Sequence, residues 1–493
     1  MTSAGSRSVA RGAGQTGRGC AGSVARFYDG RMSLRVVVPA ACALAAALLV
    51  SGPLSAQAPR PAGIKVVPVS AAGARRPAEA SVAINPTNPD HVIATFIQSS
   101  APGQQPRSSN WGYVSTDGGL TWTGTPAANP EKRVQGDDVI AFDRAGTAFH
   151  TYIAFDGIRV DRPERAFSGI HVRRSQDGAH WEPAVAVVDH VNTAIPMEDK
   201  PWMGIDRSPT SPHRGNLYVA WTRFDVYGSA DPAHRTHIWF ARSKDGGRSF
   251  QVPVRISDES GGAKDDDDTV EGAVPAVGPN GEVYVAWAGP KGLVFDTSAD
   301  GGWTFGADRV LTPLTGGWNI PVPGVERHNG MPVTATDTSS GKDRGSVYVN
   351  FIDERNGDTD VFLLASRDGG RTWSAPLRVN DDPKGAAQMF TWMAVDPVDG
   401  AVNIVFHDRR GLAGTMTGVT LARSVDGGRT FVNHRLPVEP FDCCARSNFL
   451  GDYNGIDAWG GRVVAVFPVL PAEGDQRIMA ATMRFQPGSQ TLQ

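Results

Sequence analysis

The chain has 493 residues and a formal net charge of −3, since 48 Lys and Arg nearly balance 51 Asp and Glu. This balance excludes a nucleic-acid binder that works by neutralising phosphates, which needs a clear basic excess. Charged residues make up only 20% of the chain while Gly reaches 57 residues, a composition that favours a turn-rich β protein. After the N-terminal region no apolar run approaches the ~20 residues of a membrane-spanning helix.

The first 58 residues are predicted to be a leader and signal peptide. Residues 32–35 supply a short basic start, an apolar run covers residues 36–50, and small residues follow. Translation starts at Met1 or at Met32. We expect cleavage of this segment rather than its retention as a membrane anchor. The expected product is a secreted or periplasmic protein whose residues 59–493 form a single domain.

Six later segments repeat one pattern, in which Ser, Asp and Gly are followed by Thr or Ser and an aromatic residue. Asp and Ser accept hydrogen bonds from backbone groups of the loop, and Gly supplies positive φ angles at no steric cost. The second copy is degenerate in its last half. Because six equivalent copies cannot share one active site, we predict a structural role for their aspartates. These are Asp117, Asp177, Asp245, Asp300, Asp368 and Asp426.

Short strands of alternating pattern precede each copy, as at residues 347–351 and 361–365 before the fifth. The copies recur about every 62 residues, which leaves room for four strands and their loops. Evenly spaced short strands with turn residues between them predict an all-β fold, a β-propeller of four-stranded blades.

Three further strands are predicted after the sixth copy, at residues 455–458, 462–467 and 478–483. Residues 64–69, before the first blade, supply a fourth. Pairing of the first and last strands closes the ring and removes its open edges. We therefore predict seven blades, with six as the alternative if the terminal strands form a cap.

A functional site is expected on the propeller face that carries the loops between blades and the loops joining second and third strands. The aspartate turns, which join third and fourth strands, belong to the other face. Carboxylates, arginines and tryptophans that converge on one mouth fit a sugar site, because aromatic rings stack on sugars and charged groups bind hydroxyls or move protons. The alternative for each of these residues is an inter-blade salt bridge. The segments concerned include Glu79, Asp137, Asp138, Asp199, Lys200, Trp202, Arg223, Glu271, Arg327, Arg355, Trp392, Arg409, Asp452 and Tyr453.

Through its repeats and blade pattern, the chain resembles the sialidase-like superfamily of Asp-box (BNR, or neuraminidase-type repeat) propellers over its whole mature length. Sialidases use an arginine triad, a tyrosine nucleophile assisted by a glutamate, and an aspartic acid–base. The resemblance implies that Tyr453 is the nucleophile and Glu271 its partner, with Asp452 and Asp199 as further catalytic candidates. It also implies a substrate-binding set of Arg223, Arg327, Arg355, Arg409, Trp202 and Trp392.

The first inner strand departs from the Arg-Ile-Pro motif of sialidases. It has the sequence Ala-Glu-Ala-Ser-Val at residues 78–82, so a bidentate contact to a substrate carboxylate is missing there. The chain is more similar to secreted bacterial repeat proteins with Trp-Met-x-Val-Asp and Gly-Asp-Tyr segments, here at residues 392–396 and 451–453.

Two functions remain open at this point. The first is a secreted glycoside hydrolase of the exo-α-sialidase type, a monomer that acts on a terminal sugar of an extracellular glycan. The second is a non-catalytic propeller that binds glycan or protein on its loop face. No cofactor or metal is expected, because no dinucleotide, phosphate or His/Cys metal motif occurs. The acidic run at residues 265–268 lacks the spacing of a calcium loop and favours a solvated inter-blade loop.

Cleavage of the leader leaves two of the four cysteines, the adjacent pair Cys443 and Cys444. An exported protein meets oxidising conditions, yet two adjacent cysteines provide no disulfide framework. Either they are two small buried residues, or they form a vicinal disulfide whose ring makes a rigid turn before Tyr453.

Overall fold

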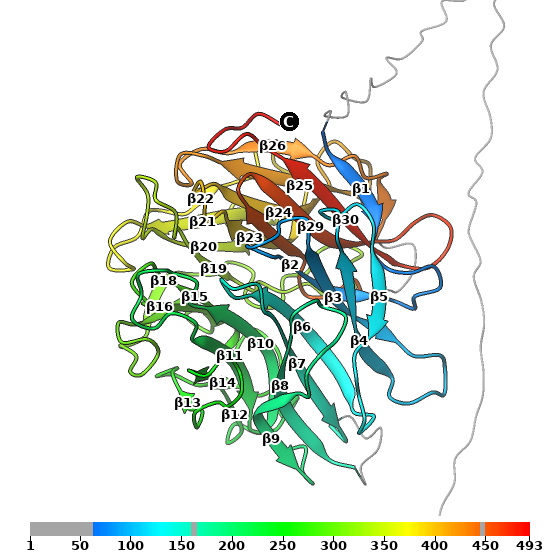
Figure 1. Cartoon of the computed structure of the whole chain (residues 1–493), viewed down its shortest axis with the longest axis vertical. Helices are drawn as coiled ribbons and strands as arrows, with labels where there is room; N and C mark the ends of the chain where they lie inside the picture. Colours follow the sequence, from blue (N-terminus) through cyan, green and yellow to red (C-terminus); the bar gives the residue numbers. More distant parts are fainter. Residues whose placement is uncertain (1–62, 159–164, 444–448) are drawn as a thin grey trace, which may run out of the picture. The chain divides into compact units, whose positions relative to one another are not determined.

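The computed structural model describes residues 63–158, 165–443 and 449–493, and these contain 30 β-strands and no helix. The strands form seven antiparallel sheets that follow one another along the chain (Figure 1). The inner strand of each sheet contacts the inner strand of the next, and β28 returns to contact β2. The described residues are therefore a closed seven-bladed propeller, as the sequence predicts.

Each of the first three blades begins with its inner strand. Blade 1 consists of β2 (Ala78–Ile84), β3 (Val92–Ser99), β4 (Ser108–Ser115) and β5 (Thr123–Pro126). Blade 2 consists of β6 (Val134–Phe142), β7 (Ala148–Asp156), β8 (Phe167–Ser175) and β9 (Val185–Val191). Blade 3 consists of β10 (Met197–Ile205), β11 (Leu217–Phe224), β12 (Arg235–Ser243) and β13 (Val254–Arg255), and the short β14 (Gly261–Gly262) also pairs with β12.

Blades 4 to 6 repeat this order. Blade 4 consists of β15 (Glu271–Val277), β16 (Val283–Gly289), β17 (Gly292–Ser298) and β18 (Arg309–Thr312). Blade 5 consists of β19 (Val333–Thr336), β20 (Val347–Asp353), β21 (Asp360–Ser366) and β22 (Leu377–Arg378). Blade 6 consists of β23 (Gln388–Val395), β24 (Val402–Asp408), β25 (Met416–Ser424) and β26 (Val432–Arg435), and β27 (Phe441–Asp442) also pairs with β25.

Blade 7 joins the two ends of the described chain. It consists of β28 (Gly455–Trp459), β29 (Arg462–Val469), β30 (Arg477–Arg484) and β1 (Lys65–Pro68). Strand β1 runs antiparallel to β30, with Lys65 opposite Thr482 and Pro68 opposite Met479. The predicted closure by the N-terminal strand is confirmed, and it leaves blade 7 with the same four strands as the others.

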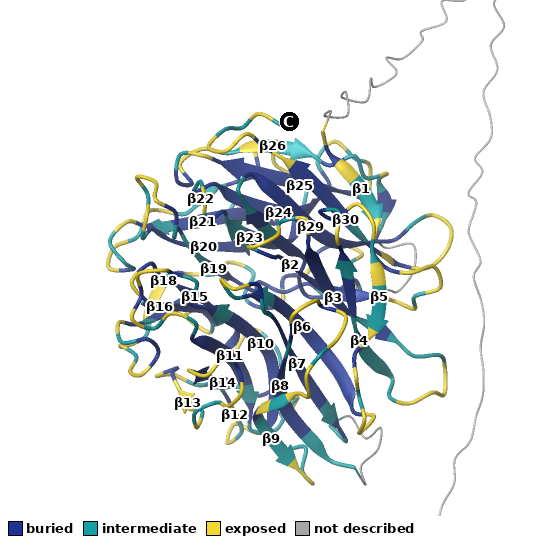
Figure 2. Ribbon diagram, in the orientation of Figure 1, coloured by how far each residue is buried: buried dark blue, intermediate teal, exposed yellow. Residues whose placement is uncertain are grey.

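The core lies between the blades rather than in one central layer. Inner strands such as β2 and β15 are buried over their whole length, whereas the short outer strands β5 and β13 are mostly exposed (Figure 2). Trp221 and Trp287, on the second strands of blades 3 and 4, are completely buried. Within the described residues no helix is long and apolar enough to cross a membrane. The predicted leader and domain boundary lie outside the described residues.

The six Ser-x-Asp-Gly turns have the predicted hydrogen bonds. In the fifth, the Ser366 hydroxyl accepts from the amide of Gly370 at 2.8 Å and donates to Asp368. Asp368 in turn accepts from the amides of Arg371 and Thr372 and from the Thr372 hydroxyl. Four other turns repeat this set. In the degenerate second turn His180 Nδ1 lies 2.7 Å from Asp177 Oδ2 and takes the place of the hydroxyl.

These turns lie at the end of each blade where the inner strand ends. Ser115, the first residue of the first turn, is opposite Val92, and Val92 is opposite Ile84 at the end of β2. The starts of the inner strands, where a functional site is predicted, therefore lie at the opposite end of the sheets.

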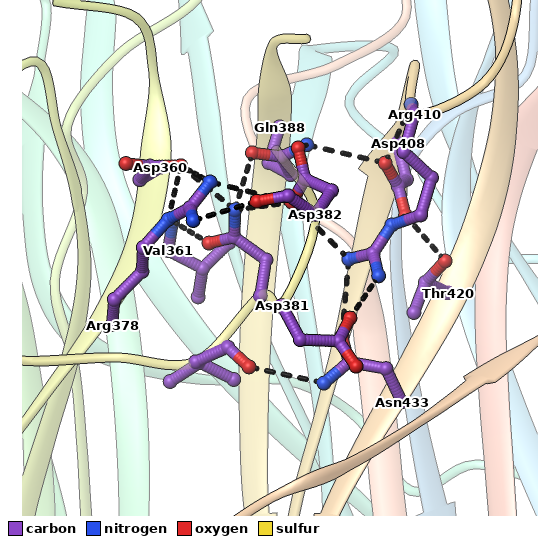
Figure 3. A network of polar contacts seen from close by, with 12 residues as sticks. Asp360, Val361, Arg378, Asp381, Asp382, Gln388, Asp408, Arg410, Thr420 and Asn433 are labelled. Atoms are coloured by element: carbon purple, nitrogen blue, oxygen red, sulfur yellow. Dashed lines mark hydrogen bonds and ion pairs between the residues drawn. The ribbon is translucent and has the colours of Figure 1, made fainter. Parts of the chain in front are cut away.

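A buried polar network connects blades 5 and 6 (Figure 3). Asp360 accepts from Arg378 at 2.8 Å, while Gln388 donates to both Asp382 and Asp408 at 3.2 Å. Arg410 forms an ion pair with Asp381 on the same network. These groups satisfy one another, so they fit the structural interpretation of charged residues at blade edges.

Candidate active site

Five inner strands carry a β-bulge at the same level, around the second to fourth residue of the strand. The pairing register shifts there in β2, β6, β10, β15 and β23. One residue of each bulge has a positive φ: Glu79 59°, Asp137 51°, Lys200 47°, Gly272 75° and Phe390 53°. A side chain in this conformation costs on the order of 1–3 kcal/mol, and bulges of this kind reorient side chains beside active sites. Backbone strain is thus concentrated at one end of the channel.

Seven charged residues meet at this end, which we call the channel mouth: Glu79, Asp137, Asp199, Lys200, Glu271, Arg327 and Asp452. Lys200 Nζ lies 2.7 Å from Asp452 Oδ2 and 3.9 Å from Glu271 Oε1, and Arg327 forms an ion pair with the same Asp452 oxygen. The backbone amide of Lys200 donates to Asp137 Oδ2 at 2.9 Å. Five carboxylates therefore share two cations in a buried cluster drawn from six blades or the loops before them.

The carboxylates of the channel mouth differ sharply in proton affinity. Burial raises the pKa of Asp452, but Arg327 and Lys200 outweigh it and lower the pKa to about 2. Burial, with repulsion from Asp452, raises the pKa of Glu79 to about 7. Burial also raises the pKa of Glu271 well above its ordinary value. One carboxylate is thus ionised beside others that hold protons near neutral pH.

Asp137 and Asp199 form a hydrogen-bonded pair of carboxyl groups. Burial raises the pKa of Asp199 to about 7 and that of Asp137 to about 6, and the hydrogen bond between them raises the former and lowers the latter. Asp199 is therefore the protonated partner and Asp137 the acceptor, so the two groups titrate as a coupled pair.

A pocket of about 170 Å³ opens at the channel mouth. Its lining includes Glu79, Asp137, Asp199, Lys200 and Arg327. Beside the pocket, two polar atoms of the cluster are buried without a hydrogen-bond partner among the described residues, Glu271 Oε1 and Asp452 Oδ1. Unpaired buried acceptors are costly and are found preferentially where a ligand or a proton is handled.

Tyr453 and the two predicted tryptophans lie together in the channel. The Trp202 and Trp392 ring centroids are 4.2 Å apart, and the Tyr453 ring is edge-on to Trp202 at 5.2 Å. The Tyr453 hydroxyl donates to the carbonyl of Asp138 at 3.4 Å. Burial and the nearby Glu79 raise the pKa of Tyr453 well above its ordinary value, so the phenol is neutral. The two tryptophans also line a cavity of about 190 Å³ toward the other end of the channel.

The four predicted arginines do not converge. Arg327 lines the pocket, whereas Arg223 lies 2.6 Å from Glu198 and stacks over Trp239. Arg355 pairs with Asp353 at 2.8 Å, and Arg409 donates to Cys443 Sγ at 2.9 Å. The substrate-binding roles of Arg223, Arg355 and Arg409 stay predictions, and each of these side chains has a partner in or beside its own blade.

Glu79, Asp137 and Lys200 are among the charged residues that the sequence predicts at the functional face, and the structure adds that they occupy equivalent positions in their blades. Each stands at the bulge, six positions before the residue that follows the inner strand, and Gly272 and Phe390 do the same in their blades. Aligning the blades by the ends of their inner strands brings these five positions into register. The constant spacing of six residues is thus visible in the sequence, whereas the positive φ angles are seen only in the structure.

Carboxylates of the acidic run at residues 265–268 form hydrogen bonds within the protein. Asp265 accepts from the Tyr227 hydroxyl at 2.6 Å, and Asp267 accepts from the amide of Asn319 at 2.8 Å. In the part of the chain that the structure describes, no group of three or more His, Cys, Asp or Glu is placed to hold a metal ion. Cys443 is buried, and Cys444 lies outside the described residues, so the vicinal disulfide stays a prediction.

Comparisons with known proteins agree with a distant resemblance in fold. No family model and no curated protein sequence matches the chain. Among solved structures, a protein of unknown function from Dyadobacter fermentans is 14% identical, with 86% of this chain and 100% of that chain covered and a TM-score of 0.45. Penicillium chrysogenum α-L-arabinanase is 14% identical over 73% and 97%, with a TM-score of 0.46. The NanB sialidase of Streptococcus pneumoniae is 8% identical over 86% and 94%, with a TM-score of 0.45.

The matches thus include sialidases, as the resemblance in the sequence implies, but none of those named is close. At these identities and TM-scores they carry no argument about chemistry.

Proposed function

We propose that the channel mouth is the active site of a sialidase-like glycoside hydrolase that removes a terminal sugar from a glycan. The observation that carries the proposal is the separation of pKa values within the channel-mouth cluster: Glu79 and Asp199, which line the pocket, near 7, and Asp452, which pairs with Lys200 and Arg327, near 2. Carboxyl groups whose environments push their pKa values apart are the acid and base pairs of glycoside hydrolysis.

The roles follow from which groups line the pocket and which are tied up. Glu79 holds its proton up to neutral pH, so it is the proposed acid that protonates the leaving oxygen. Asp137, with the lower pKa of the coupled pair, is the proposed base or nucleophile. Asp452 is locked between Lys200 and Arg327 and serves to fix these two cations. The alternative that the resemblance implies, with Tyr453 as the nucleophile and Glu271 as its partner, stays a prediction that the same variant series tests.

Pocket size and the departure from the sialidase motif favour a single neutral sugar. The volume of about 170 Å³ is below the ~300 Å³ at which pockets for larger ligands begin, so a chain end fits better than an internal segment. The stretch that carries an arginine motif in sialidases contains Glu79 here, so a bidentate contact to a substrate carboxylate is missing. A neutral terminal sugar is therefore proposed in place of sialic acid.

The test is a panel of fluorogenic glycosides, with neutral pyranosides, an α-L-arabinofuranoside and an α-sialoside, incubated with the full chain. We expect hydrolysis of a neutral glycoside, and a loss of about 10²–10⁴-fold in turnover in Glu79→Gln, because a proton donor is removed. Asp245→Asn, in an aspartate turn, is the matched control and keeps its turnover.

Hydrolysis of the sialoside alone would refute the neutral-sugar proposal. If the protein binds a glycan array but hydrolyses no member of the panel, the result would favour the alternative function, a non-catalytic propeller that binds glycan. Tyr453→Phe and Glu271→Gln, measured on the same substrate, decide whether the sialidase-type nucleophile operates.

We also propose that the mature protein is exported and acts as a monomer on extracellular glycan. The N-terminal pattern of residues 32–58 supports export, and blade 7 supports the monomer because its four strands all come from this chain and none has to be supplied by a second copy. N-terminal sequencing of the processed protein and its mass in solution test the two statements. An uncleaved protein in the membrane fraction, or a stable dimer, would contradict them.

A further inference from the structure

A second and larger pocket lies on blade 2, away from the channel mouth. Its lining comes from strands β6 to β9, from residues 128–131 and from residues 181–184, and its volume is about 580 Å³. This volume falls in the range of ~300–1,000 Å³ typical of small-molecule sites. Gln135 contributes to the walls of both pockets, and the other lining residues of the two are different. We call this pocket the blade 2 cleft.

Flat side chains form one wall of the blade 2 cleft. Tyr152 and His171, opposite each other on β7 and β8, are stacked with centroids 5.8 Å apart and an interplanar angle of 23°. The Arg173 guanidinium lies 4.7 Å from the centroid of the Trp181 ring. A wall of ring faces and a stacked guanidinium offers a flat, weakly polar surface to a ligand of similar flatness.

Both positively and negatively charged side chains surround this wall. Arg133 donates to both oxygens of Asp189, at 2.7 and 3.2 Å, and also to Glu131 at 2.6 Å. The side chains of Glu131 and Glu182 remain more than half exposed, at 58% and 51%, so their oxygens are open to a ligand. With three carboxylates and two guanidinium groups in the lining, the cleft has no positive excess that would select an anion.

One polar atom of the lining is left without a partner among the described residues. His171 Nδ1 is buried with no hydrogen bond. Tyr152, which stacks on His171, is itself only 4% exposed and lines the same cleft. Buried polar groups are almost always paired, so unpaired atoms that line a cavity point to a missing ligand or solvent partner.

We propose that the blade 2 cleft binds a neutral sugar ring of a glycan, at a site separate from the channel mouth. The apolar face of a sugar stacks on the ring wall, its hydroxyls donate to Asp189, Glu131 and Glu182, and its oxygens accept from Arg173 and Tyr152. A purely aromatic ligand would cover the carboxylates without giving them donors, which costs free energy. An anionic ligand would face three carboxylates. The inference does not depend on hydrolysis at the channel mouth.

The experiment measures binding of methyl pyranosides (gluco, galacto, manno and xylo) and their β-linked disaccharides to the full chain by saturation-transfer NMR and calorimetry. Ala186 is exposed on β9 opposite His171 and lines the cleft, so Ala186→Phe fills the space without disturbing the core. Ala186→Ser is the matched control. We expect saturable binding of a panel sugar that weakens about tenfold or more in Ala186→Phe and is unchanged in Ala186→Ser.

Tyr152→Phe provides the second variant, since it removes the hydroxyl proposed as a donor to the sugar and keeps the ring. We expect it to weaken the same sugar severalfold, while Glu79→Gln at the channel mouth leaves this binding unchanged. The proposal is overturned if no panel sugar saturates, if Ala186→Phe binds as well as the wild type, or if Glu79→Gln is the variant that abolishes binding. Thermal unfolding of each variant confirms that the fold is intact.

Discussion

The two faces of this propeller use carboxylates in opposite ways. In the turns, each aspartate is held by donors within four residues of the chain, and the Thr372 hydroxyl and amide lower the pKa of Asp368 below its ordinary value. At the channel mouth, Glu79 and Asp199 are buried among other carboxylates from distant segments, and their pKa values rise to about 7. The structural framework is thus marked by repeated turns whose polar groups are hydrogen-bonded within the turn. The candidate site is marked by residues outside the repeat, by strained backbone and by buried polar atoms without hydrogen-bond partners.

The two groups of carboxylates change the folding stability in opposite directions as pH rises. The turn aspartates have lowered pKa values, so their stabilisation is present above the unfolded pKa near 3.8 and is lost as pH falls through the folded pKa. Glu79 and Asp199 have raised pKa values, so the folded state is favoured below the unfolded pKa and loses stability as pH rises toward 7. The two faces therefore respond to pH in opposite directions.

The largest effect is expected for Lys200→Met at the channel mouth. The substitution removes the cation that Asp452 contacts at 2.7 Å and leaves buried negative charge uncompensated, at a cost of about 3–5 kcal/mol. Urea unfolding at pH 7 measures it. The matched control is Lys291→Met, whose ion pair with Glu259 is exposed by more than half on both sides and is worth about 1 kcal/mol or less. Equal losses in the two variants would show that burial of the channel-mouth charges adds nothing to the cost of losing a cation.

Ser366→Ala tests the framework side. The variant leaves the buried amide of Gly370 without its 2.8 Å acceptor, which costs about 1–3 kcal/mol, while turnover per folded molecule stays unchanged. The measurements are urea unfolding and a rate normalised to active protein. A variant of normal stability that has lost turnover would show that the turns belong to the site.

Glu79→Gln and Asp199→Asn test the sign of the pH dependence. Each variant removes an ionisation that opposes folding at high pH, so stability relative to the wild type rises as pH increases from about 4 toward 7, by roughly 3 kcal/mol. Unfolding curves at a series of pH values measure this difference. A constant offset across the range would mean that neither group has a raised pKa.

The contrast also explains what the sequence predicts. Each aspartate turn is complete within about seven residues, so its copies predict the blades, and pairing of residues 64–69 with the last strand follows from counting strands. The channel mouth is assembled from segments as far apart as Lys200 and Asp452, which only ring closure brings together. Left-handed Glu79 and Asp137 could not be foreseen, since such φ values usually fall to Gly or Asn. The arginine triad, by contrast, rests on the family resemblance alone, since only Arg327 of the four candidates lines the channel-mouth pocket.

The smallest effect is expected in the degenerate turn of blade 2, where the closing group itself titrates. His180 replaces the Thr or Ser hydroxyl of the other turns, and its hydrogen bond to Asp177 raises the pKa of the exposed imidazole above its ordinary value. The stabilisation from this contact is therefore present below the unfolded pKa near 6.5 and is lost as pH rises through the folded pKa. Because the pair is exposed, salt screens the attraction between His180 and Asp177.

His180→Thr supplies the hydroxyl that the other turns use, so the variant no longer loses this contribution between pH 6 and 8. Thermal unfolding of the two proteins in low and high salt measures the difference, with Thr372→Ser as a control that keeps a hydroxyl in the fifth turn. If the pH dependence of the wild type and His180→Thr coincides at low salt, the imidazole is a spectator, and the second turn is held by its backbone hydrogen bonds alone.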